Sequence, residues 1–408
     1  MRLVVDHRTQ GQGVEGVHLL GMARAFERAG AEVSIVSPPG VEVGRPGAAP
    51  RKAPGLRGLW WMLAEHVPET LFELMEMVYN VPAYFRLRRA LRTPRADALY
   101  ERYAFFHVAG ALAAGAAGVP LILEVNYTAA TPLYRNRSRL LRPLARAAER
   151  FVFRRAGLIV AVSSVLREAI VAGGIPADRV LTMPNAADPD RFRPEISGEA
   201  VRERYGLRGA RVVGFTGAFF PWHGVGFLLD ALAALLRDMP EAAALLVGDG
   251  PERPLLEERV RREGLEARVR FAGWIGHEGL PEHVAAFDIA VMPDSNEYGS
   301  PMKIYEYMAM GKPVVAPRLG PLADGIVDGG TGILFPRRDP AALQAALASL
   351  LGDEALRARM GANARAHVLA HHTWDRNAAR VLERIAAAPE ADAAISGDRG
   401  RTVAPPGT

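Results

Sequence analysis

The segment SPMKIYEYMAMGKPVVAP, residues 300–317, combines a cation and an anion on one short predicted helix. Lys303 lies in its first turn, where the positive end of the helix dipole disfavours a cation by roughly 0.3–1 kcal/mol. Glu306 follows at i+3 and shares the same helix face, but a simple ion pair would contribute only about 0.3 kcal/mol. A phosphate bound at the helix start explains the lysine better, because it gains from the first amides and from the ammonium. Glu306, one turn deeper, could accept hydrogen bonds from sugar or ribose hydroxyls, so the pattern favours a nucleotide-sugar.

The residues around this pair define the expected helix. Ser300 is the expected N-cap, and Pro301 is expected at the first helical position, where its missing N–H costs nothing. Met302 and Ile304 flank the lysine and belong to the same predicted donor-binding segment. Gly311 is expected to close the helix before an apolar strand.

Two further loops follow predicted strands and precede predicted helices. In GFTGAFFPWHGVG, a strand ends at Gly217, and Trp222 and His223 come just before the helix. His223 could hydrogen-bond a ligand phosphate there, although Trp222 buried in a packing loop with His223 as a cap is an equally simple interpretation. In LLVGDGPER, the turn of Gly248, Asp249 and Gly250 lies where a base or ribose could stack.

The first loop of the chain carries Gly11, Gly13 and Gly16, a literal G-x-G-x-x-G between a strand and a helix. Amides at such a helix start bind phosphate or shape an acceptor pocket. A dinucleotide site would also need an acidic residue at the end of the second strand, which instead runs into SIVSPPG. The loop is therefore interpreted as an acceptor or phosphate loop.

Composition restricts the classes of function. The chain has 408 residues, 49% of them hydrophobic, no cysteine and a formal net charge of +5. Thiolate chemistry and cysteine-ligated metals are thereby excluded. The arginines gather in the first half and could contact phosphates or simply cover solvated faces; they include Arg86, Arg88, Arg89, Arg92, Arg95, Arg135, Arg137, Arg139, Arg142, Arg146, Arg150, Arg154 and Arg155. Because only Phe151 and Phe153 interleave with residues 135–155, nucleic acid is not an expected partner.

Short apolar strands alternate with helical stretches along the whole chain, which predicts an α/β fold with parallel sheets covered on both faces. The expected strands are RLVV, EVSIVS, DALYER, PLILEV and GLIVAVS, then RVVGFTG, AALLVGDG, RVRFAGW, DIAVMP, PVVAP and GILF. A Pro- and Asp-rich junction at 183–198 separates the two series. We therefore expect two Rossmann-like domains facing across a cleft, with ligands outside the carboxyl ends of the strands.

Metal binding is not expected from the motifs. The DPD of residues 188–190 lies in the predicted interdomain turn, where Asp and Pro are common. The histidines of GHEGLPEH, residues 276–283, are six apart with a proline between them, which does not fit a zinc helix. The HHT of residues 371–373 is expected to start the last helix.

Taken in this order, the loops resemble those of the retaining GT-B glycosyltransferases of family 4. The resemblance covers about residues 1–388 and rests on GQGVEGVHLLGMARAFERAGAEVSIV, LIVAVSS, MPNAADPDRFRP, GFTGAFFPWHGV, VGDGPER and SPMKIYEYMAMGKPVVA. It implies an acceptor-binding domain at 1–186, a nucleotide-sugar donor domain at 187–370, and a helix at 371–388 crossing back to the first domain. Residues 389–408 are rich in Pro, Ala, Gly and Asp, so we expect a disordered tail there. It also implies a metal-independent hexosyltransferase with no cofactor beyond the nucleotide-sugar co-substrate.

Residue by residue, the resemblance assigns donor contacts and exposes departures. Glu306 matches the second glutamate of the family's E-x7-E signature, but Tyr298 stands where the first glutamate is expected. Ala218 and His223 occupy the places of the usual Arg and Lys for the diphosphate. Lys303, His223 and Asn126 are the expected residues at the reacting centre, with Asn126 restricted to positioning because an amide is no general base. His107 could compensate for a missing histidine, or could equally be a buried helix residue.

The acceptor is the least determined part. Residues 59–91 place tryptophan, methionine and leucine beside the first arginine cluster. This segment could lie on a membrane and meet a lipid-linked glycan, as in polysaccharide or glycolipid assembly, or could be a helix pair packed on the acceptor domain. The N-terminus does not resemble a signal peptide, so we expect a cytoplasmic protein. A nucleotide-sugar epimerase and a non-catalytic basic phosphate- or nucleic-acid-binding protein are the alternative functions.

Overall fold

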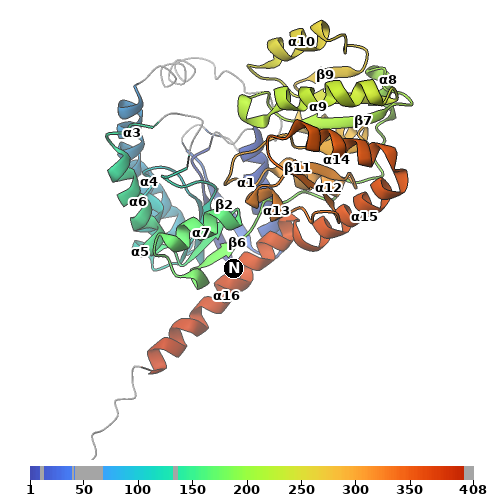
Figure 1. The fold of residues 1–408 in the computed structure, drawn as a ribbon. Helices are drawn as coiled ribbons and strands as arrows, with labels where there is room; N and C mark the ends of the chain where they lie inside the picture. Colours follow the sequence, from blue (N-terminus) through green and yellow to red (C-terminus); the bar gives the residue numbers. More distant parts are fainter. Residues whose placement is uncertain (10–12, 39–40, 42–67, 132–136, 399–408) are drawn as a thin grey trace, which may run out of the picture.

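The computed structural model describes residues 1–9, 13–38, 41, 68–131 and 137–398, with side chains of the last helix described up to residue 387. It contains two six-stranded sheets, each in its own α/β unit (Figure 1). Every strand pair is parallel, as expected when helices connect the strands. The predicted fold class is thereby confirmed.

The first sheet has the order β2-β1-β3-β4-β5-β6. Its strands are β1 Arg2–Asp6, β2 Glu32–Val36, β3 Ala98–Arg102, β4 Leu121–Val125, β5 Leu158–Ala161 and β6 Val180–Thr182. Its helices are α1 Gly13–Arg28, α3 Glu69–Val78, α4 Asn80–Arg92, α5 Ala109–Ala117, α6 Arg142–Arg155 and α7 Ser164–Ala172. Apolar side chains fill both faces of the sheet, so the strands read as continuous hydrophobic runs.

The second sheet has the order β12-β11-β10-β7-β8-β9. Its strands are β7 Arg211–Thr216, β8 Ala242–Val247, β9 Val269–Gly273, β10 Ile289–Val291, β11 Val314–Pro317 and β12 Gly332–Phe335. Its helices are α8 Glu199–Arg204, α9 Val225–Asp238, α10 Arg253–Arg262, α11 Leu280–Ala285, α12 Met302–Ala309, α13 Gly320–Ala323, α14 Pro340–Gly352 and α15 Glu354–His371. Two apolar clusters again cover its faces.

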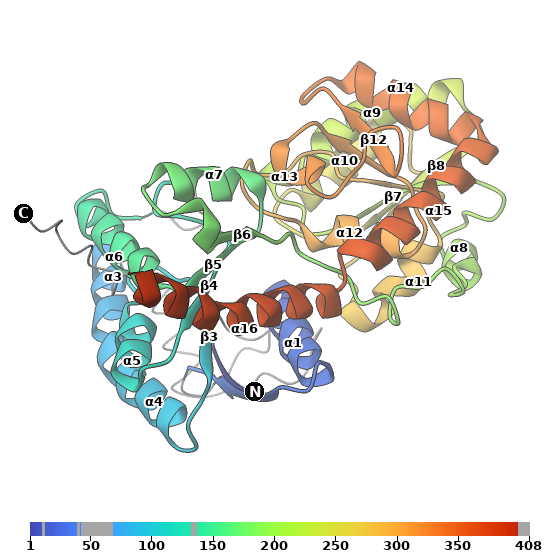
Figure 2. The same cartoon turned by 90° about the horizontal axis from the view of Figure 1, so that it is seen from below.

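The last helix, α16 Trp374–Asp398, returns to the first domain (Figure 2). It packs against α1, where the buried Trp374 ring meets His18 edge-on at a centroid distance of 5.0 Å. Gly21 permits this contact, because a Cβ there would lie 2.7 Å from the indole. The helix also continues through residues 389–398, which the sequence analysis placed in a disordered tail.

The segment 59–91 is only partly described. Of residues 59–91, the described part forms α3 and α4, and the remainder lies outside the described residues. Among the described residues, no helix has both the length and the apolar character needed to cross a bilayer.

Candidate functional site

A cavity of about 740 Å³ lies between the two domains. Residues at the carboxyl ends of strands from both sheets line it, as expected for parallel α/β folds. The predicted site residues in its wall are Gly13, Asn126, Gly217, Trp222, His223, Gly248, Asp249, Ser300, Pro301, Met302, Lys303 and Glu306. Gly16 is buried in α1, Ile304 is buried in the second-domain core, Gly250 packs against Phe219, and Gly11 lies outside the described residues.

Lys303 is half-buried, but its ammonium nitrogen is buried and has no hydrogen-bond partner among the described residues. Its Nζ lies 4.6 Å from the centre of the Phe215 ring, a favourable but weak cation–π contact. Burial lowers the pKa of Lys303 to about 8, although the negative Glu306 opposes that shift. Although Glu306 lies nearby, a buried ammonium without a hydrogen-bond partner is costly, so this position favours an anionic ligand.

Two glycines shape the wall beside this ammonium. Gly217 has φ +143°, and a Cβ there would lie 2.3 Å from Lys303 Nζ. Gly248 has φ +144°, and a Cβ there would lie 1.9 Å from the carbonyl oxygen of Gly217. Because L side chains rarely adopt this conformation and no space exists for them, both loops require glycine.

His223 lies in a 3-10 turn, Pro221–His223, directly before α9. Its Nδ1 donates a hydrogen bond to the Ala218 carbonyl, which fixes the tautomer of the neutral ring. Burial and the nearby Lys303 charge lower the pKa of His223 to about 4. At neutral pH the ring is uncharged and its Nε2 is an acceptor, so it can bind a hydroxyl directly but a phosphate only after taking up a proton.

Glu306 has a partner that the sequence analysis did not assign. His277 Nε2 lies 3.2 Å from Glu306 Oε1, and both side chains line the cavity. His277 comes from the loop after β9, one of the loops following strands. The sequence analysis considered His277 only as part of GHEGLPEH, which does not fit a zinc helix. Its contact with Glu306 spans 29 residues and therefore leaves no local sequence signal.

The start of α12 differs from the expected one. The helix begins at Met302, and Pro301 is its N-cap, so the prediction of Ser300 as N-cap is wrong. The Ser300 hydroxyl instead accepts a hydrogen bond from the Asn185 backbone N–H at 3.0 Å, and the Ser300 carbonyl accepts one from the Asn185 amide at 2.5 Å. Ser300 therefore ties the donor segment to the first domain rather than capping the helix. Gly311, with φ +67°, follows the helix end as predicted.

Two tryptophans present indole surface to the cavity. Trp222 is 41% exposed and stacks on Phe220 with ring centres 4.5 Å apart, so the interpretation of Trp222 as buried is wrong. Trp274, 51% exposed, also lines the cavity and was not assigned from the sequence. Nearby, Asp249 pairs with Arg253 at 3.0 Å. Flat apolar faces beside polar groups suit a base or a sugar ring.

On the first-domain side, Asn126 follows β4 and donates from its amide to Glu124 Oε1 at 2.6 Å. Glu124 is buried and also accepts from the Tyr100 hydroxyl at 2.5 Å. Burial alone would raise the pKa of Glu124, but His18, Arg102 and these two hydrogen bonds hold it below its ordinary value. Arg102, with its Nε 3.8 Å from Glu124 Oε1, lines the cavity.

Other candidates lie away from the cavity or serve the fold. Asp188 accepts hydrogen bonds from the backbone of Asp190 and Arg191, so DPD forms a turn. Tyr298 lines the cavity, and its carbonyl accepts a hydrogen bond from the Ser163 hydroxyl of the first domain at 2.6 Å. His107 is buried, does not line the cavity, and contacts Asp6 at 2.8 Å.

Comparison with known families gives matches in both domains. The family model described as glycosyl transferase 4-like domain matches residues 15–186, and the one described as glycosyl transferases group 1 matches residues 210–353. The alpha-D-kanosaminyltransferase of Streptomyces kanamyceticus is 31% identical over 256 residues, 60% of this chain and 65% of that protein. A GDP-mannose-dependent alpha-(1-6)-phosphatidylinositol monomannoside mannosyltransferase of Mycolicibacterium smegmatis is 32% identical over 61% of this chain and 67% of that protein. The matches thus span about two thirds of these relatives.

Solved structures show the same fold. The crystal structure of Anabaena Alr3699/HepE in complex with UDP superposes with a TM-score of 0.71 at 23% identity, covering 95% of this chain and 99% of that one. A glycosyltransferase from Rickettsia africae gives a TM-score of 0.71 at 16% identity, covering 95% and 98% of the two chains. At these identities the likeness concerns the arrangement of the two domains.

Proposed function

The chain belongs to the group 1, family 4-like glycosyltransferases, and on that premise we propose that it transfers a sugar from a nucleoside-diphosphate sugar to a hydroxyl acceptor. The observation that carries this proposal is the unpaired, buried ammonium of Lys303 in the wall of the interdomain cavity. A diphosphate there pairs with Lys303, and Glu306 accepts hydrogen bonds from the ribose hydroxyls. UDP and UDP-glucose bound to Anabaena Alr3699/HepE, of the same fold, support this choice of ligand.

We propose that transfer retains the configuration of the anomeric carbon. The bond from that carbon to the diphosphate oxygen breaks as the acceptor oxygen attacks from the same face. Negative charge grows on the departing diphosphate as this bond breaks, and the diphosphate oxygen then takes the acceptor's hydroxyl proton. Lys303 stabilises that charge, as do the first amides of α12, and no protein nucleophile or metal ion takes part. His223, neutral with a free Nε2 lone pair, orients a hydroxyl at the reacting centre.

Calorimetric titration with UDP, GDP, ADP and CMP tests the donor site. One nucleoside diphosphate is expected to bind, and Glu306→Ala is expected to weaken it by roughly 1.5–3 kcal/mol because a charged hydrogen-bond acceptor is lost. If none of the four binds, or if the variant binds equally well, the donor is wrongly placed. Slow hydrolysis of the matching nucleotide-sugar, followed by proton NMR, tests retention, since the first sugar anomer released should keep the donor's configuration.

We further propose that the first domain contacts a membrane and that the acceptor is lipid-linked. Helices α3, α4 and α6 all lie at the outer edge of this domain (Figure 1). Apolar side chains on α3 and α4 are exposed, among them Val78 at 70%, Val81 at 61% and Phe85 at 61%. Exposed arginines flank them, including Arg89 and Arg92. Apolar surface bordered by cations suits an anionic bilayer.

Cosedimentation with vesicles of phosphatidylglycerol and phosphatidylcholine tests this contact. The chain is expected to bind vesicles that contain the anionic lipid, and to bind them less after Val81→Ser with Phe85→Ser. Leu255→Ser is the matched control, because Leu255 is 68% exposed on α10 of the other domain. Equal loss in both variants, or equal binding to neutral vesicles, contradicts the proposed surface.

A further inference from the structure

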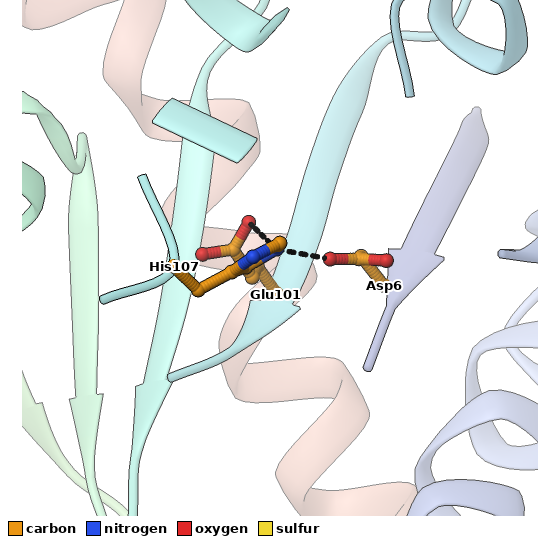
Figure 3. Close-up of side chains that lie close together, drawn as sticks. All are labelled: Asp6, Glu101 and His107. Atoms are coloured by element: carbon orange, nitrogen blue, oxygen red, sulfur yellow. Dashed lines mark hydrogen bonds and ion pairs between the residues drawn. The ribbon is translucent and has the colours of Figure 1, made fainter. Parts of the chain in front are cut away.

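Three ligand-bearing side chains converge inside the first domain, away from the cavity. Asp6 ends β1, Glu101 lies near the end of β3, and His107 precedes α5. Figure 3 shows the three side chains pointing toward one another. His107 Nε2 lies 2.8 Å from Asp6 Oδ2 and 3.6 Å from Glu101 Oε2, and the three donor atoms are within 4.8 Å of one another.

The sheet register forces the two carboxylates together. Asp6 and Glu101 are partners across the parallel pair β1 and β3, so both side chains lie side by side on one face. Like charges at such positions destabilise a sheet. The exposed fractions are only 5% for Asp6 and 0% for Glu101, so solvent does not screen them. Something within the fold must neutralise this pair.

The protein's own groups do so only in part. His107 contacts Asp6, but neither carboxylate oxygen of Glu101 has a hydrogen-bond partner among the described residues. The Glu101 carboxylate already lies against α5, where its Oε2 occupies the space that a Cβ on Gly110 would take, at 1.4 Å. Either a proton or a cation must therefore accompany this carboxyl.

We propose that Asp6, Glu101 and His107 bind one divalent transition-metal ion, with zinc the best fit. Two carboxylates balance its charge, and one imidazole with two oxygens is a donor set that zinc accepts, whereas calcium and magnesium prefer oxygen ligands throughout. Ligand atoms on a tetrahedral zinc ion with bonds of about 2.0–2.2 Å lie roughly 3.3–3.6 Å apart. The His107–Glu101 separation of 3.6 Å matches these values, the His107–Asp6 hydrogen bond of 2.8 Å would lengthen on binding, and the remaining pair lies within 4.8 Å.

The ion would serve the acceptor half of the cavity rather than the reacting centre. It would join the ends of β1 and β3 to the segment that leads into α5. Arg102, the residue after Glu101, lines the cavity, and Asp6 leads into the loop toward Gly13, which also lines it. This inference does not depend on the proposed glycosyl transfer, because metal content and nucleotide binding are measured separately.

Elemental analysis of the full chain, purified without metal-affinity resin and dialysed against zinc, tests the proposal. About one retained zinc ion per chain is expected, as for a site with three protein ligands. After chelation, titration with Co²⁺ should give the visible absorption bands of a tetrahedral site. His107→Ala and Glu101→Gln should each abolish stoichiometric retention and the bands, with folding checked by circular dichroism.

His371→Ala is the matched control. His371 lies close to His367 on α15, at a ring-centroid distance of 4.9 Å. This histidine pair, outside the proposed site, could hold metal adventitiously. The control should keep the zinc. Loss of metal in His371→Ala but not in His107→Ala overturns the assignment. A wild-type chain that retains no zinc and gives no cobalt bands also overturns it, and indicates a proton on Glu101; because this readout uses no variant, misfolding cannot obscure it.

Discussion

The two halves of the cavity differ in how their charges are satisfied. In the second-domain half, the ammonium of Lys303 is buried and unpaired. In the first-domain half, Glu124 accepts hydrogen bonds from Asn126 and Tyr100 and lies near Arg102. The donor half therefore contains an ammonium whose hydrogen bonds a ligand can supply, whereas these acceptor-half groups already satisfy one another. We therefore expect the donor side to supply most of the binding energy for the nucleotide and most of the stabilisation of the departing charge. The acceptor side should mainly orient the acceptor.

A side chain added to the wall of the donor half should have the largest effect on stability and nucleotide binding. Gly248→Ala adds a Cβ at φ +144° and 1.9 Å from the Gly217 carbonyl oxygen. We expect a loss of roughly 2–5 kcal/mol of unfolding free energy from strain and overpacking, and no measurable nucleotide binding. Gly264→Ala is the control, since its φ is +67° with nothing within 4 Å of the added Cβ. It should cost about 1–2 kcal/mol and leave binding intact. Denaturant titration and calorimetry give both quantities, and equal effects of the two changes would contradict the close approach.

Two half-buried lysines of the second domain differ in their hydrogen bonds. The Lys303 ammonium has no hydrogen-bond partner among the described residues. The Lys312 ammonium donates hydrogen bonds to the carbonyls of Ala285 at 3.0 Å and Phe287 at 2.6 Å. Lys303→Met should weaken binding of the nucleoside diphosphate by roughly 1.5–3 kcal/mol, or about 10- to 150-fold, without lowering stability. Lys312→Met should lower stability by about 2 kcal/mol without changing binding. Thermal unfolding and calorimetry on both variants measure this, and loss of stability in Lys303→Met would mean that its charge is satisfied within the fold.

Sequence patterns predicted the sheets well and the contacts between distant segments poorly. Each expected strand corresponds to one in the structure, because a buried parallel strand is a local apolar run. The strand β6, Val180–Thr182, was missed, since three residues ending in Thr give too short a run. Lys303 and the glycine loops were found because helix position and glycine spacing are local features.

The remaining features depend on pairings that no local pattern contains. Ser300 contacts Asn185 across 115 residues, which no capping rule anticipates. His277 meets Glu306 only because the β9 loop approaches α12. The convergence of Asp6, Glu101 and His107 requires the register between β1 and β3.

The pH dependence should separate affinity from stability in the donor half. With a pKa of about 8 in the free protein, Lys303 loses its proton above that pH, and affinity for the diphosphate should fall by up to about tenfold per pH unit. The unfolded chain has its lysine pKa near 10.4, so between about pH 8 and 10 it binds more protons than the folded chain. The deprotonation of Lys303 should therefore raise the free energy of unfolding between about pH 8 and 10, the same range in which affinity for the diphosphate falls. Calorimetry and denaturant titration across this range measure both, and Lys303→Met should lack this component of each; an unchanged affinity profile in the variant would assign it to another group.

The smallest effect should arise in the acceptor half, from Asn126→Ala. This change removes one hydrogen bond to Glu124 Oε1, while Tyr100 and Arg102 still face the carboxylate. Because Glu124 stays ionised and mostly satisfied, we expect a loss of only about 1 kcal/mol, seen as a roughly fivefold lower initial rate of sugar transfer at saturating donor. Nucleotide affinity should stay unchanged, as Asn126 lies across the cavity from Lys303. Asn126→Asp should lower the rate further, since it places a second carboxylate beside Glu124. If Asn126→Ala weakens nucleotide binding as much as Lys303→Met does, the two halves of the cavity do not have separate roles, and the donor must contact both.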